Sequence, residues 1–357
     1  MKQKLIFTNL VGEAIDSLVA DLGNPQVAVV VDTNTAQFVL PIVMKVSKTI
    51  AGAEVITVKA GDANKNINEL AELWKKLSDM EATRKTVVVN LGGGVVSDMA
   101  GFAAATFKRG MRCINVPTTL LAAVDAAVGG KTGINFNGLK NQLGVFSEPE
   151  AAVISTLFFN TLPQQEILSG YAEMLKHALL EDAKVLADLL NFNPVYPYFD
   201  ADALLPRLEE SVMVKAGIVD KDLTETGLRK ALNLGHTVGH ALEAFSYSHK
   251  SPIPHGYAVA WGLVTELVLS HIQLGFPSDT LHSFAAYVKE LYGAFPLTCD
   301  DYPELISAMR QDKKNASPDK INFTLLSAVG KPKTDCTASP EQICAALDIY
   351  RDLMGLA

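Results

Sequence analysis

Short β-branched runs alternate with helical patterns along the first 160 residues, and this alternation limits the possible folds more than any other feature. The runs are QVAVVVDTN, AEVITVKAGD, KTVVVNLGGG and RCINVPTT. Between the second and third runs, Leu70, Leu73, Trp74 and Leu77 recur at the spacing of one helical face. Strands that alternate with helices form a parallel sheet that those helices cover. Residues 1–160 are therefore predicted to form an α/β domain.

The strand signals fade after residue 160. Helical patterns follow at 164–190, 203–219, 226–246, 257–274 and 279–292. A chain of 357 residues is long enough for two domains of ordinary size. Residues 161–357 are therefore predicted to form an all-α domain, with the boundary near Thr161 to Pro163.

Charge and cysteine content argue against several classes of protein. The formal net charge of -8 disfavours binding to nucleic acid, although a local basic pocket for one phosphorylated metabolite remains compatible with it. The four cysteines form no CxxC pair, which fits a reducing cytoplasm. The N-terminus has too short an apolar stretch for a signal peptide, and the most apolar segment, 257–272, carries Glu266 and His271. Neither export nor membrane insertion is expected.

The segment LNLGHTVGHALE places two histidines four residues apart in an otherwise apolar run. If 226–246 is one helix, its polar residues share one side. They are Arg229, Asn233, His236, His240 and Glu243. Such a stripe could simply face water. However, Gly235 and Gly239 each cost about 1 kcal/mol in a helix interior, so we expect another group to approach the backbone closely there. The mixture of polar groups favours a ligand pocket.

Two neighbouring motifs supply further donors for a metal ion. PHGYAVAWG contains His255, and SGYAEMLKHA contains Glu173. A single histidine is more often structural than a ligand, but a His/His/Glu set with an open fourth position suits a catalytic zinc. The sequence therefore offers His236, His240, His255 and Glu173 as candidate ligands.

Two glycine-rich segments could approach phosphate groups. VVVNLGGGVVSDMAG places three glycines before a helix predicted to begin near Val95, which suits a pyrophosphate, although an ordinary tight turn has the same pattern. Asp32 ends an earlier strand, where it could bind a ribose or cap a turn. A second segment, VDAAVGGKTGINFNGLKNQLG, is predicted to be a loop that offers cations to a phosphate or carboxylate. A solvated loop would look similar. Together the first segment and Asp32 favour NAD.

These motifs, in this order, resemble the 3-dehydroquinate synthase family over most of the chain. The most specific are GGGVVSDMAGFAAATFKRG, VPTTLLAAVDAAVGGKTGIN, KNQLGVF, TLPQQEILSGYAEMLKHALL, NLGHTVGHALE and HGYAVAWG. The resemblance implies a Rossmann-like, NAD-binding α/β N-terminal domain and an all-α, metal-binding C-terminal domain. It also implies an active site in the cleft between them, a sugar phosphate substrate and a homodimer.

The resemblance also assigns roles to individual residues. The implied ligands of one Zn2+ or Co2+ are Glu173, His236 and His255. The implied NAD contacts are Asp32, Asn34, Lys65, Gly93, Gly94, Val95, Asp98, Thr118, Thr119, Asp125, Lys131, Lys140, Phe158, Thr161, Leu162 and Glu166. The implied catalytic and substrate-binding residues are Lys131, Asn141, Lys176, Lys215, Arg229, Asn233 and His240, with Arg109 reaching the phosphate from the partner subunit. Lys313 or Lys314 is expected to close over the site.

The implied reaction converts 3-deoxy-D-arabino-heptulosonate 7-phosphate into 3-dehydroquinate and phosphate, a carbon-oxygen lyase step of the shikimate pathway. It proceeds through transient oxidation by NAD, phosphate elimination, re-reduction and an intramolecular aldol closure. A metal-dependent polyol dehydrogenase, another sugar phosphate cyclase and a non-catalytic NAD-binding regulator are the alternatives. The sequence departs from the family at Tyr257 and Asp62, where family members commonly have glutamate, and Tyr257 puts the surroundings of His255 in question.

Overall fold

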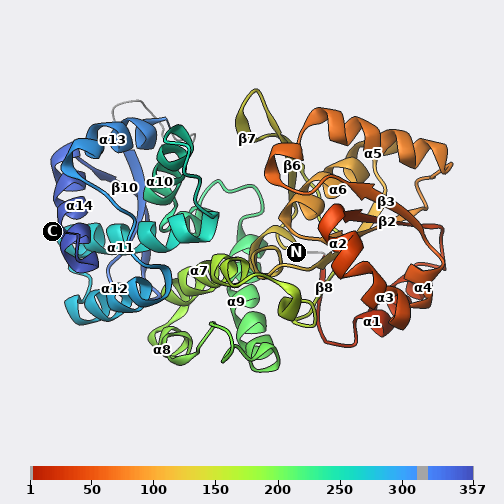
Figure 1. Cartoon of the computed structure of the whole chain (residues 1–357), viewed down its shortest axis with the longest axis horizontal. Helices are drawn as coiled ribbons and strands as arrows, with labels where there is room; N and C mark the ends of the chain where they lie inside the picture. Colours follow the sequence, from red (N-terminus) through yellow and green to blue (C-terminus); the bar gives the residue numbers. More distant parts are fainter. Residues whose placement is uncertain (1–2, 312–320, 357) are drawn as a thin grey trace. The chain divides into compact units, whose positions relative to one another are not determined.

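The computed structural model describes residues 3–311 and 321–356, which belong to two compact units (Figure 1). The first unit comprises Met1–Ile167 and Asp200–Ala216, and the second comprises Leu168–Phe199 and Gly217–Ala357. A single boundary near residue 160 would assign Asp200–Ala216 to the second domain, whereas the structure packs this segment with the first unit.

The first unit is built on a six-stranded sheet in the order β1-β8-β5-β4-β2-β3, and every neighbouring pair is parallel. The strands are β1 (Lys4–Phe7), β2 (Val27–Asp32), β3 (Glu54–Val58), β4 (Val87–Gly92), β5 (Arg112–Pro117) and β8 (Ala151–Ile154). The helices are α1 (Val11–Asp21), α2 (Thr33–Phe38), α3 (Leu40–Val46), α4 (Lys48–Ala51), α5 (Ile67–Asp79) and α6 (Gly94–Thr106). The predicted parallel α/β arrangement is confirmed.

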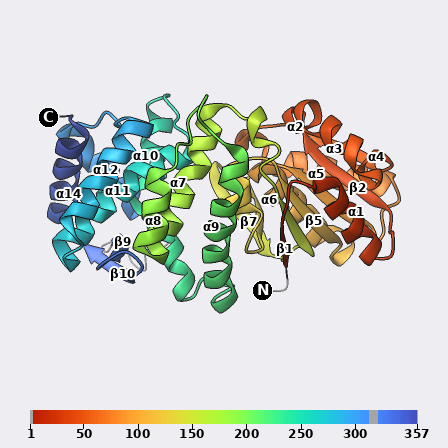
Figure 2. The same ribbon diagram turned by 90° about the horizontal axis from the view of Figure 1, so that it is seen from below.

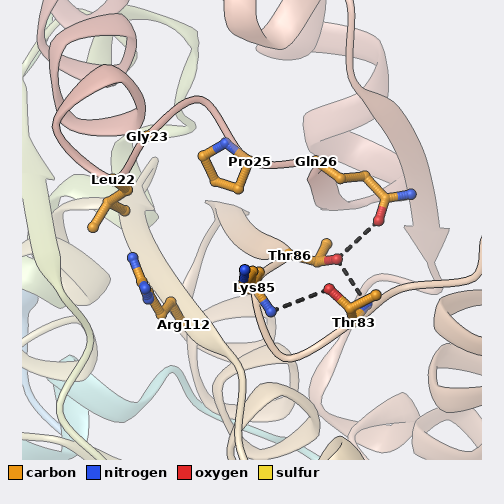
Figure 3. Close-up of a pocket in the computed structure, with 8 residues that line it drawn as sticks. All are labelled: Leu22, Gly23, Pro25, Gln26, Thr83, Lys85, Thr86 and Arg112. Carbon is orange, nitrogen blue, oxygen red and sulfur yellow. Dashed lines mark hydrogen bonds between the residues drawn. The ribbon is translucent and has the colours of Figure 1, made fainter.

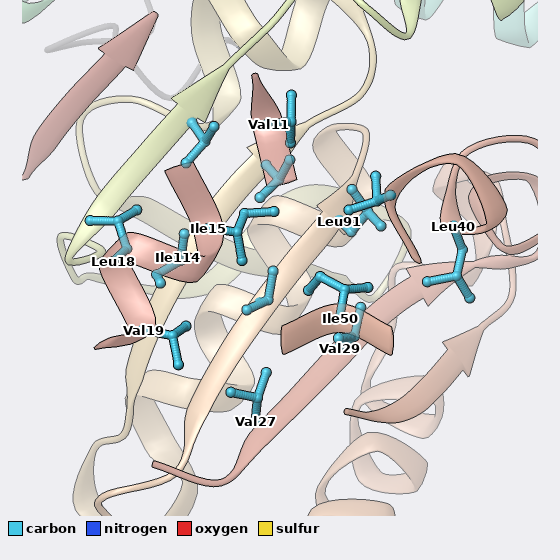
Figure 4. Close-up of a cluster of buried hydrophobic side chains, with 14 of the residues drawn as sticks. Val11, Ile15, Leu18, Val19, Val27, Val29, Leu40, Ile50, Leu91 and Ile114 are labelled. Carbon is cyan, nitrogen blue, oxygen red and sulfur yellow. The ribbon is translucent and has the colours of Figure 1, made fainter. Parts of the chain in front are cut away.

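Both faces of this sheet are covered, because alternate residues of β2 enter two different cores. Val27 and Val29 pack with residues of α1, including Ile15, in the cluster that Figure 4 shows. Ala28 and Val30 pack with α5 and α6 on the opposite face. The continuous apolar run of β2 therefore follows from its central place in the sheet.

The segment that follows β5 contains a hairpin, so the prediction of a loop there is wrong. β6 (Lys131–Phe136) pairs antiparallel with β7 (Leu139–Phe146). Asn137 and Gly138 connect the strands with φ values of 50° and 76°, the left-handed pair that a two-residue hairpin turn requires. The strands also approach closely, since a Cβ at Gly144 would lie 2.1 Å from the carbonyl oxygen of Thr132.

The second unit is mainly helical, as predicted. Its helices are α7 (Gln164–Glu181), which begins in the first unit, α8 (Ala183–Asn191), α10 (His236–Ser248), α11 (His255–Leu274), α12 (Ser278–Tyr292), α13 (Tyr302–Arg310) and α14 (Pro340–Met354). α9 (Ala201–Lys221) begins in the first unit and ends in the second. The predicted helix over 164–190 is two helices, because Asp182 caps α8 by accepting hydrogen bonds from two backbone N-H groups.

The prediction that the second domain is all-α is wrong in one respect. β9 (Ile321–Leu326) and β10 (Pro332–Ala338) form an antiparallel hairpin, which Figure 2 shows near one end of the helices of this unit. The backbone N-H of Leu326 donates to Ser270 of α11, so the hairpin depends on contacts between distant parts of the chain. α11 is long and apolar enough to cross a membrane, but 72% of its apolar stretch is buried, as is usual for a core helix.

Candidate active site

Three of the candidate donors meet in the second unit. Glu173 lies on α7, His236 is the first residue of α10, and His255 is the first residue of α11. The Nε2 atoms of His236 and His255 lie 3.3 Å and 3.4 Å from Oε1 of Glu173. One ligand atom from each residue falls within 4.8 Å of the other two. We call Glu173, His236 and His255 the donor cluster.

The chain turns sharply just before His236, and the prediction of one helix over 226–246 is wrong. A 3-10 turn, η5 (Leu228–Asn233), ends before Gly235, whose φ of 79° breaks the helix. The polar residues of this segment therefore do not form a single helical stripe. The expected close approach is confirmed, but the approaching group is α11: a Cβ at Gly239 would lie 3.0 Å from the carbonyl oxygen of Ala258.

Glu266 fixes the start of α10 from the neighbouring helix α11. Its fully buried carboxylate accepts hydrogen bonds from the backbone N-H groups of Gly235, Thr237 and Val238 at 2.7 Å, 3.0 Å and 3.1 Å. These groups have no partner inside the helix, and a carboxylate there also interacts favourably with the helix dipole. The position of His236 therefore depends on a residue that follows it by thirty positions.

Replacement of Glu266 by alanine is expected to destabilise the protein strongly. The substitution leaves three buried N-H groups without their acceptor, at about 1–3 kcal/mol each, so we expect a loss of about 3 kcal/mol or more in the free energy of unfolding. Urea unfolding followed by circular dichroism measures this loss. Glu304→Ala is the control, because Glu304 is half exposed and accepts one hydrogen bond from Ser248. Equal midpoints for the two variants would contradict the assigned role of Glu266.

Opposite charges stabilise each other inside the donor cluster. Burial raises the pKa of Glu173, but the neighbouring Lys176 ammonium and His236 outweigh it and hold the pKa well below its ordinary value. Burial lowers the pKa of His255, yet the carboxylates of Glu173 and Glu243 raise it to about 9. A fully buried carboxylate that stays ionised needs positive charge beside it, and a divalent cation supplies such charge.

The donor cluster fits a divalent transition metal. It offers two imidazole nitrogens and one carboxylate oxygen, the set that zinc and cobalt accept, and three protein donors leave positions open for a substrate. The ring nitrogens that do not face Glu173 also have hydrogen-bond partners. For example, Nδ1 of His236 lies 3.0 Å from the carbonyl oxygen of Leu234. The neighbouring His240 ring lies 5.3 Å from that of His236, measured between centroids. His240 therefore lies beside the donor cluster.

The other predicted substrate residues of the second unit lie next to the cluster in the sequence. Lys176 is buried on α7 and forms an ion pair with Glu173. Arg229 is buried on η5, where its Nη1 donates to the carbonyl oxygen of Leu223 at 2.6 Å. Asn233 ends η5 and donates through Nδ2 to Oε1 of Glu225 at 3.1 Å.

Predicted NAD residues gather at the carboxyl ends of the strands in the first unit, where open α/β sheets bind ligands. Asp32 ends β2 and caps α2: its Oδ1 accepts from the N-H groups of Asn34 and Thr35, each at 2.8 Å. The turn-cap interpretation is confirmed for this oxygen. Gly93 and Gly94 follow β4, and α6 begins at Gly94, one residue before the predicted start. A Cβ at Gly93 would lie 3.1 Å from Thr119, so the glycine also serves the turn itself.

Two lysines of the first unit bind predicted site residues directly. Nζ of Lys65 lies 2.5 Å from Oδ2 of Asp98 and 2.5 Å from Oδ1 of Asn141. Nζ of Lys215, on α9, lies 2.5 Å from both the carbonyl oxygen and Oδ1 of Asp125. The structure thus groups residues that are far apart in the sequence into two polar clusters within this unit.

The remaining predicted residues vary in their surroundings. Those that follow the carboxyl ends of β5 and β8 are Thr118, Thr119, Thr161, Leu162 and Glu166. Lys131, Lys140 and Arg109 are exposed. Phe158, by contrast, is fully buried in the sheet core, so its side chain cannot line an open NAD site and only its backbone could contact NAD. Lys313 and Lys314 lie outside the described residues.

Sequence reasoning missed two carboxylates and one aromatic cluster. Glu243 was assigned only to a polar stripe and Glu266 only to an apolar segment, yet a carboxylate inside an apolar helix is itself a signal of a buried partner. Tyr257 packs edge-on against Trp261 and Tyr292, so it belongs to an aromatic cluster. The carboxylate beside His255 is supplied by Glu243 instead.

A pocket of about 480 Å³ opens at the opposite, amino end of the sheet strands (Figure 3). It is lined by Leu22, Gly23, Pro25, Gln26, Thr83, Lys85, Thr86 and Arg112. None of the predicted site residues lines it. The Thr86 hydroxyl accepts from the backbone N-H of Thr83 and donates to the side-chain oxygen of Gln26, which stabilises the loops at this edge.

Comparisons with known proteins identify the family. Residues 55–169 match the family model for the 3-dehydroquinate synthase N-terminal region, and residues 170–315 match that for the C-terminal region. A 3-dehydroquinate synthase from Parabacteroides distasonis is 44% identical over 358 residues, which cover 99% of each chain. The chain belongs to the 3-dehydroquinate synthase family. The predicted family is therefore confirmed, and with it membership of a family of carbon-oxygen lyases.

Solved structures of related cyclases share the fold of this 3-dehydroquinate synthase family member. A 2-deoxy-scyllo-inosose synthase complexed with carbaglucose-6-phosphate, NAD+ and Co2+ has a TM-score of 0.83 at 22% identity, covering 98% of this chain and 96% of that one. The 2-epi-5-epi-valiolone synthase ValA from Streptomyces hygroscopicus, with NAD+ and Zn2+ bound, has a TM-score of 0.81 at 22% identity, covering 99% and 97%. These similarities confirm the predicted fold class.

Proposed function

We propose that the chain converts 3-deoxy-D-arabino-heptulosonate 7-phosphate into 3-dehydroquinate and phosphate, with NAD and one Zn2+ or Co2+ as cofactors. The observation that carries the proposal is the donor cluster, which brings Glu173, His236 and His255 together in a chain that is 44% identical to a 3-dehydroquinate synthase. Bound NAD would reversibly oxidise one substrate carbinol, and a bound divalent cation would lower the pKa of its hydroxyl group.

The protein's own residues would bind and orient the substrate. Lys215, Arg229 and Asn233 offer two cations and an amide for the substrate carboxylate and hydroxyls, and His240 offers an imidazole for a further oxygen. The exposed Lys131 supplies positive charge that would offset the charge on the departing phosphate. Lys176, paired with Glu173, would keep that carboxylate ionised. By holding the substrate in one conformer, these residues would also favour the intramolecular aldol closure.

We also propose that the protein acts in the cytoplasm as a homodimer in which Arg109 reaches the phosphate of the partner subunit's site. All four cysteines are free, which agrees with a reducing compartment. Arg109 is exposed, and β7 exposes Leu139, Val145 and Phe146, an apolar surface of the kind that protein interfaces cover. Sedimentation at the assay concentration would show a single chain mass if the dimer did not form.

Phosphate release tests the proposed activity. With the heptulosonate phosphate, NAD and Zn2+ or Co2+, we expect catalytic release of phosphate while absorbance at 340 nm shows no accumulation of NADH. Chelation of the metal is expected to stop the release, and added Zn2+ or Co2+ to restore it.

The same assay separates the alternatives. Accumulation of NADH with glycerol-like polyols, without phosphate release, would identify a metal-dependent polyol dehydrogenase. Equal turnover of sugar phosphates that lack a carboxylate would identify another sugar phosphate cyclase. Metal-independent NAD binding without turnover of either substrate class would identify a regulator.

A further inference from the structure

Glu243, which has no part in the proposed reaction, lies beside the donor cluster. It follows His240 by three positions on α10, and only 7% of its surface is exposed. Its Oε2 lies 3.4 Å from Nδ1 of His255, whereas Nε2 of the same ring lies 3.4 Å from Oε1 of Glu173. The ring of His255 therefore lies between two carboxylates, one at each nitrogen.

The ring of His236 has the same arrangement with a different outer partner. Its Nδ1 lies 3.0 Å from the carbonyl oxygen of Leu234, and its Nε2 faces Glu173. A carbonyl oxygen only accepts hydrogen bonds, so it holds the proton on Nδ1 and leaves the Nε2 lone pair available to a metal ion. The Oε2 atom of Glu243 takes the same place behind Nδ1 of His255. In its neutral, metal-binding form each ring would thus keep its proton on Nδ1, next to the acceptor behind it, and present Nε2 to a metal ion.

We propose that Glu243 is a positioning residue for metal binding, which holds the tautomer and orientation of His255 and strengthens its bond to a divalent cation. This inference rests on the metal-binding role in the proposed function. A histidine ligand whose other nitrogen donates to a carboxylate is oriented and made more basic.

The charge balance of the cluster supports this role. Two neutral imidazoles, the two carboxylates of Glu173 and Glu243, the buried ammonium of Lys176 that is paired with Glu173, and a divalent ion sum to one positive charge. Without Glu243 the same buried group would carry two positive charges. Uncompensated charge in a buried site is costly, so the second carboxylate favours metal binding.

A second metal ion is the competing interpretation of the same residues. His240, Glu243 and His255 also place one ligand atom each within 4.8 Å of the others. The two sets share His255, and a second ion on its Nδ1 would displace the proton that donates to Glu243. The hydrogen-bonding arrangement therefore favours one ion per chain, with Glu243 as an acceptor behind it.

Metal titration of the whole protein tests the inference. Zn2+ affinity is measured by competition with a chromophoric chelator, and Co2+ binding by its visible absorption spectrum. We expect one ion per wild-type chain, an affinity about 10- to 100-fold lower in Glu243→Gln, and an intermediate affinity with an altered cobalt spectrum in Glu243→Asp. NAD affinity and the far-ultraviolet circular dichroism spectrum are expected to stay unchanged in both variants.

The control is Glu304→Gln. Glu304 accepts a hydrogen bond from Ser248 at the end of α10, the helix that carries Glu243, and this variant is expected to bind metal as wild type does. Wild-type metal affinity in both Glu243 variants would overturn this inference but leave the proposed function standing. Two ions per wild-type chain and one in Glu243→Gln would also overturn it, because Glu243 would then be a ligand. If Glu243→Gln failed to fold, the affinity and cobalt spectrum of Glu243→Asp would decide. Absence of tight metal binding in the wild type would instead overturn the proposed function.

Discussion

His236→Ala is expected to abolish stoichiometric metal binding and turnover while leaving NAD affinity almost unchanged. His236 supplies one of only three donor atoms in the cluster, and its Nε2 lies 3.3 Å from Glu173. Loss of an outer partner alone lowers metal affinity by about 10- to 100-fold, so loss of a ligand is expected to cost more than about 100-fold. Elemental analysis of the purified variant, together with the phosphate-release assay, measures both effects.

NAD binding provides the internal reference for this experiment, because the predicted NAD residues belong to the first unit and His236 to the second. His282→Ala is the matched control, because His282 is an exposed histidine on α12 of the same unit and its Nδ1 lies 2.8 Å from the carbonyl oxygen of Ser278. Full metal content in His236→Ala would refute the assignment of the donor cluster as a metal site.

Lys215→Ala is expected to reduce kcat/KM far more than it reduces stability. In the proposed function the buried ammonium of Lys215 would bind the substrate carboxylate, and removal of one such contact from a reacting complex typically costs about 10²- to 10³-fold. The stability loss is expected to be about 1–2 kcal/mol, because its partner Asp125 is 43% exposed and can be hydrated once the lysine is gone. Steady-state kinetics and thermal unfolding of the same preparation measure the two effects.

Lys221→Ala serves as the control on the same helix, because Lys221 is exposed at the end of α9. It should behave as wild type in both measurements. A collapse of the unfolding midpoint in Lys215→Ala, with activity per folded molecule retained, would assign Lys215 a structural role. Arg229→Ala is less informative than the sequence suggests, since Arg229 is fully buried and its removal would also leave a cavity.

Local sequence patterns predicted the α/β unit and most helices of the second unit correctly. Each pattern spans about ten residues, and the burial of one face within that span determines its period. The same reasoning failed where one residue overrides the pattern. Gly235 ends a helical run that is periodic on both sides, and Asn137 with Gly138 turns a glycine-rich segment into a hairpin. In both cases a left-handed backbone conformation decided the structure.

Site residues were predicted as types and motifs, and their individual roles remain predictions. Asp32 shows how one residue can suit two interpretations, because both hydrogen bonds that cap α2 go to its Oδ1 and the predicted NAD contact could use Oδ2. Phe158 shows the opposite case. The motif implied an NAD contact, but the side chain is buried in the sheet core, so only the backbone of Phe158 could make that contact.

The sequence by itself determined the kinds of donors, the parallel sheet and the family, because each depends on local periodicity or on the order of motifs. Only the tertiary structure decided that Glu173, His236 and His255 meet, that Glu266 caps the helix carrying His236, and that Glu243 lies behind His255. The physical reason is that these contacts join separate helices. Their geometry follows from how the helices pack, and no pattern within a single segment records it.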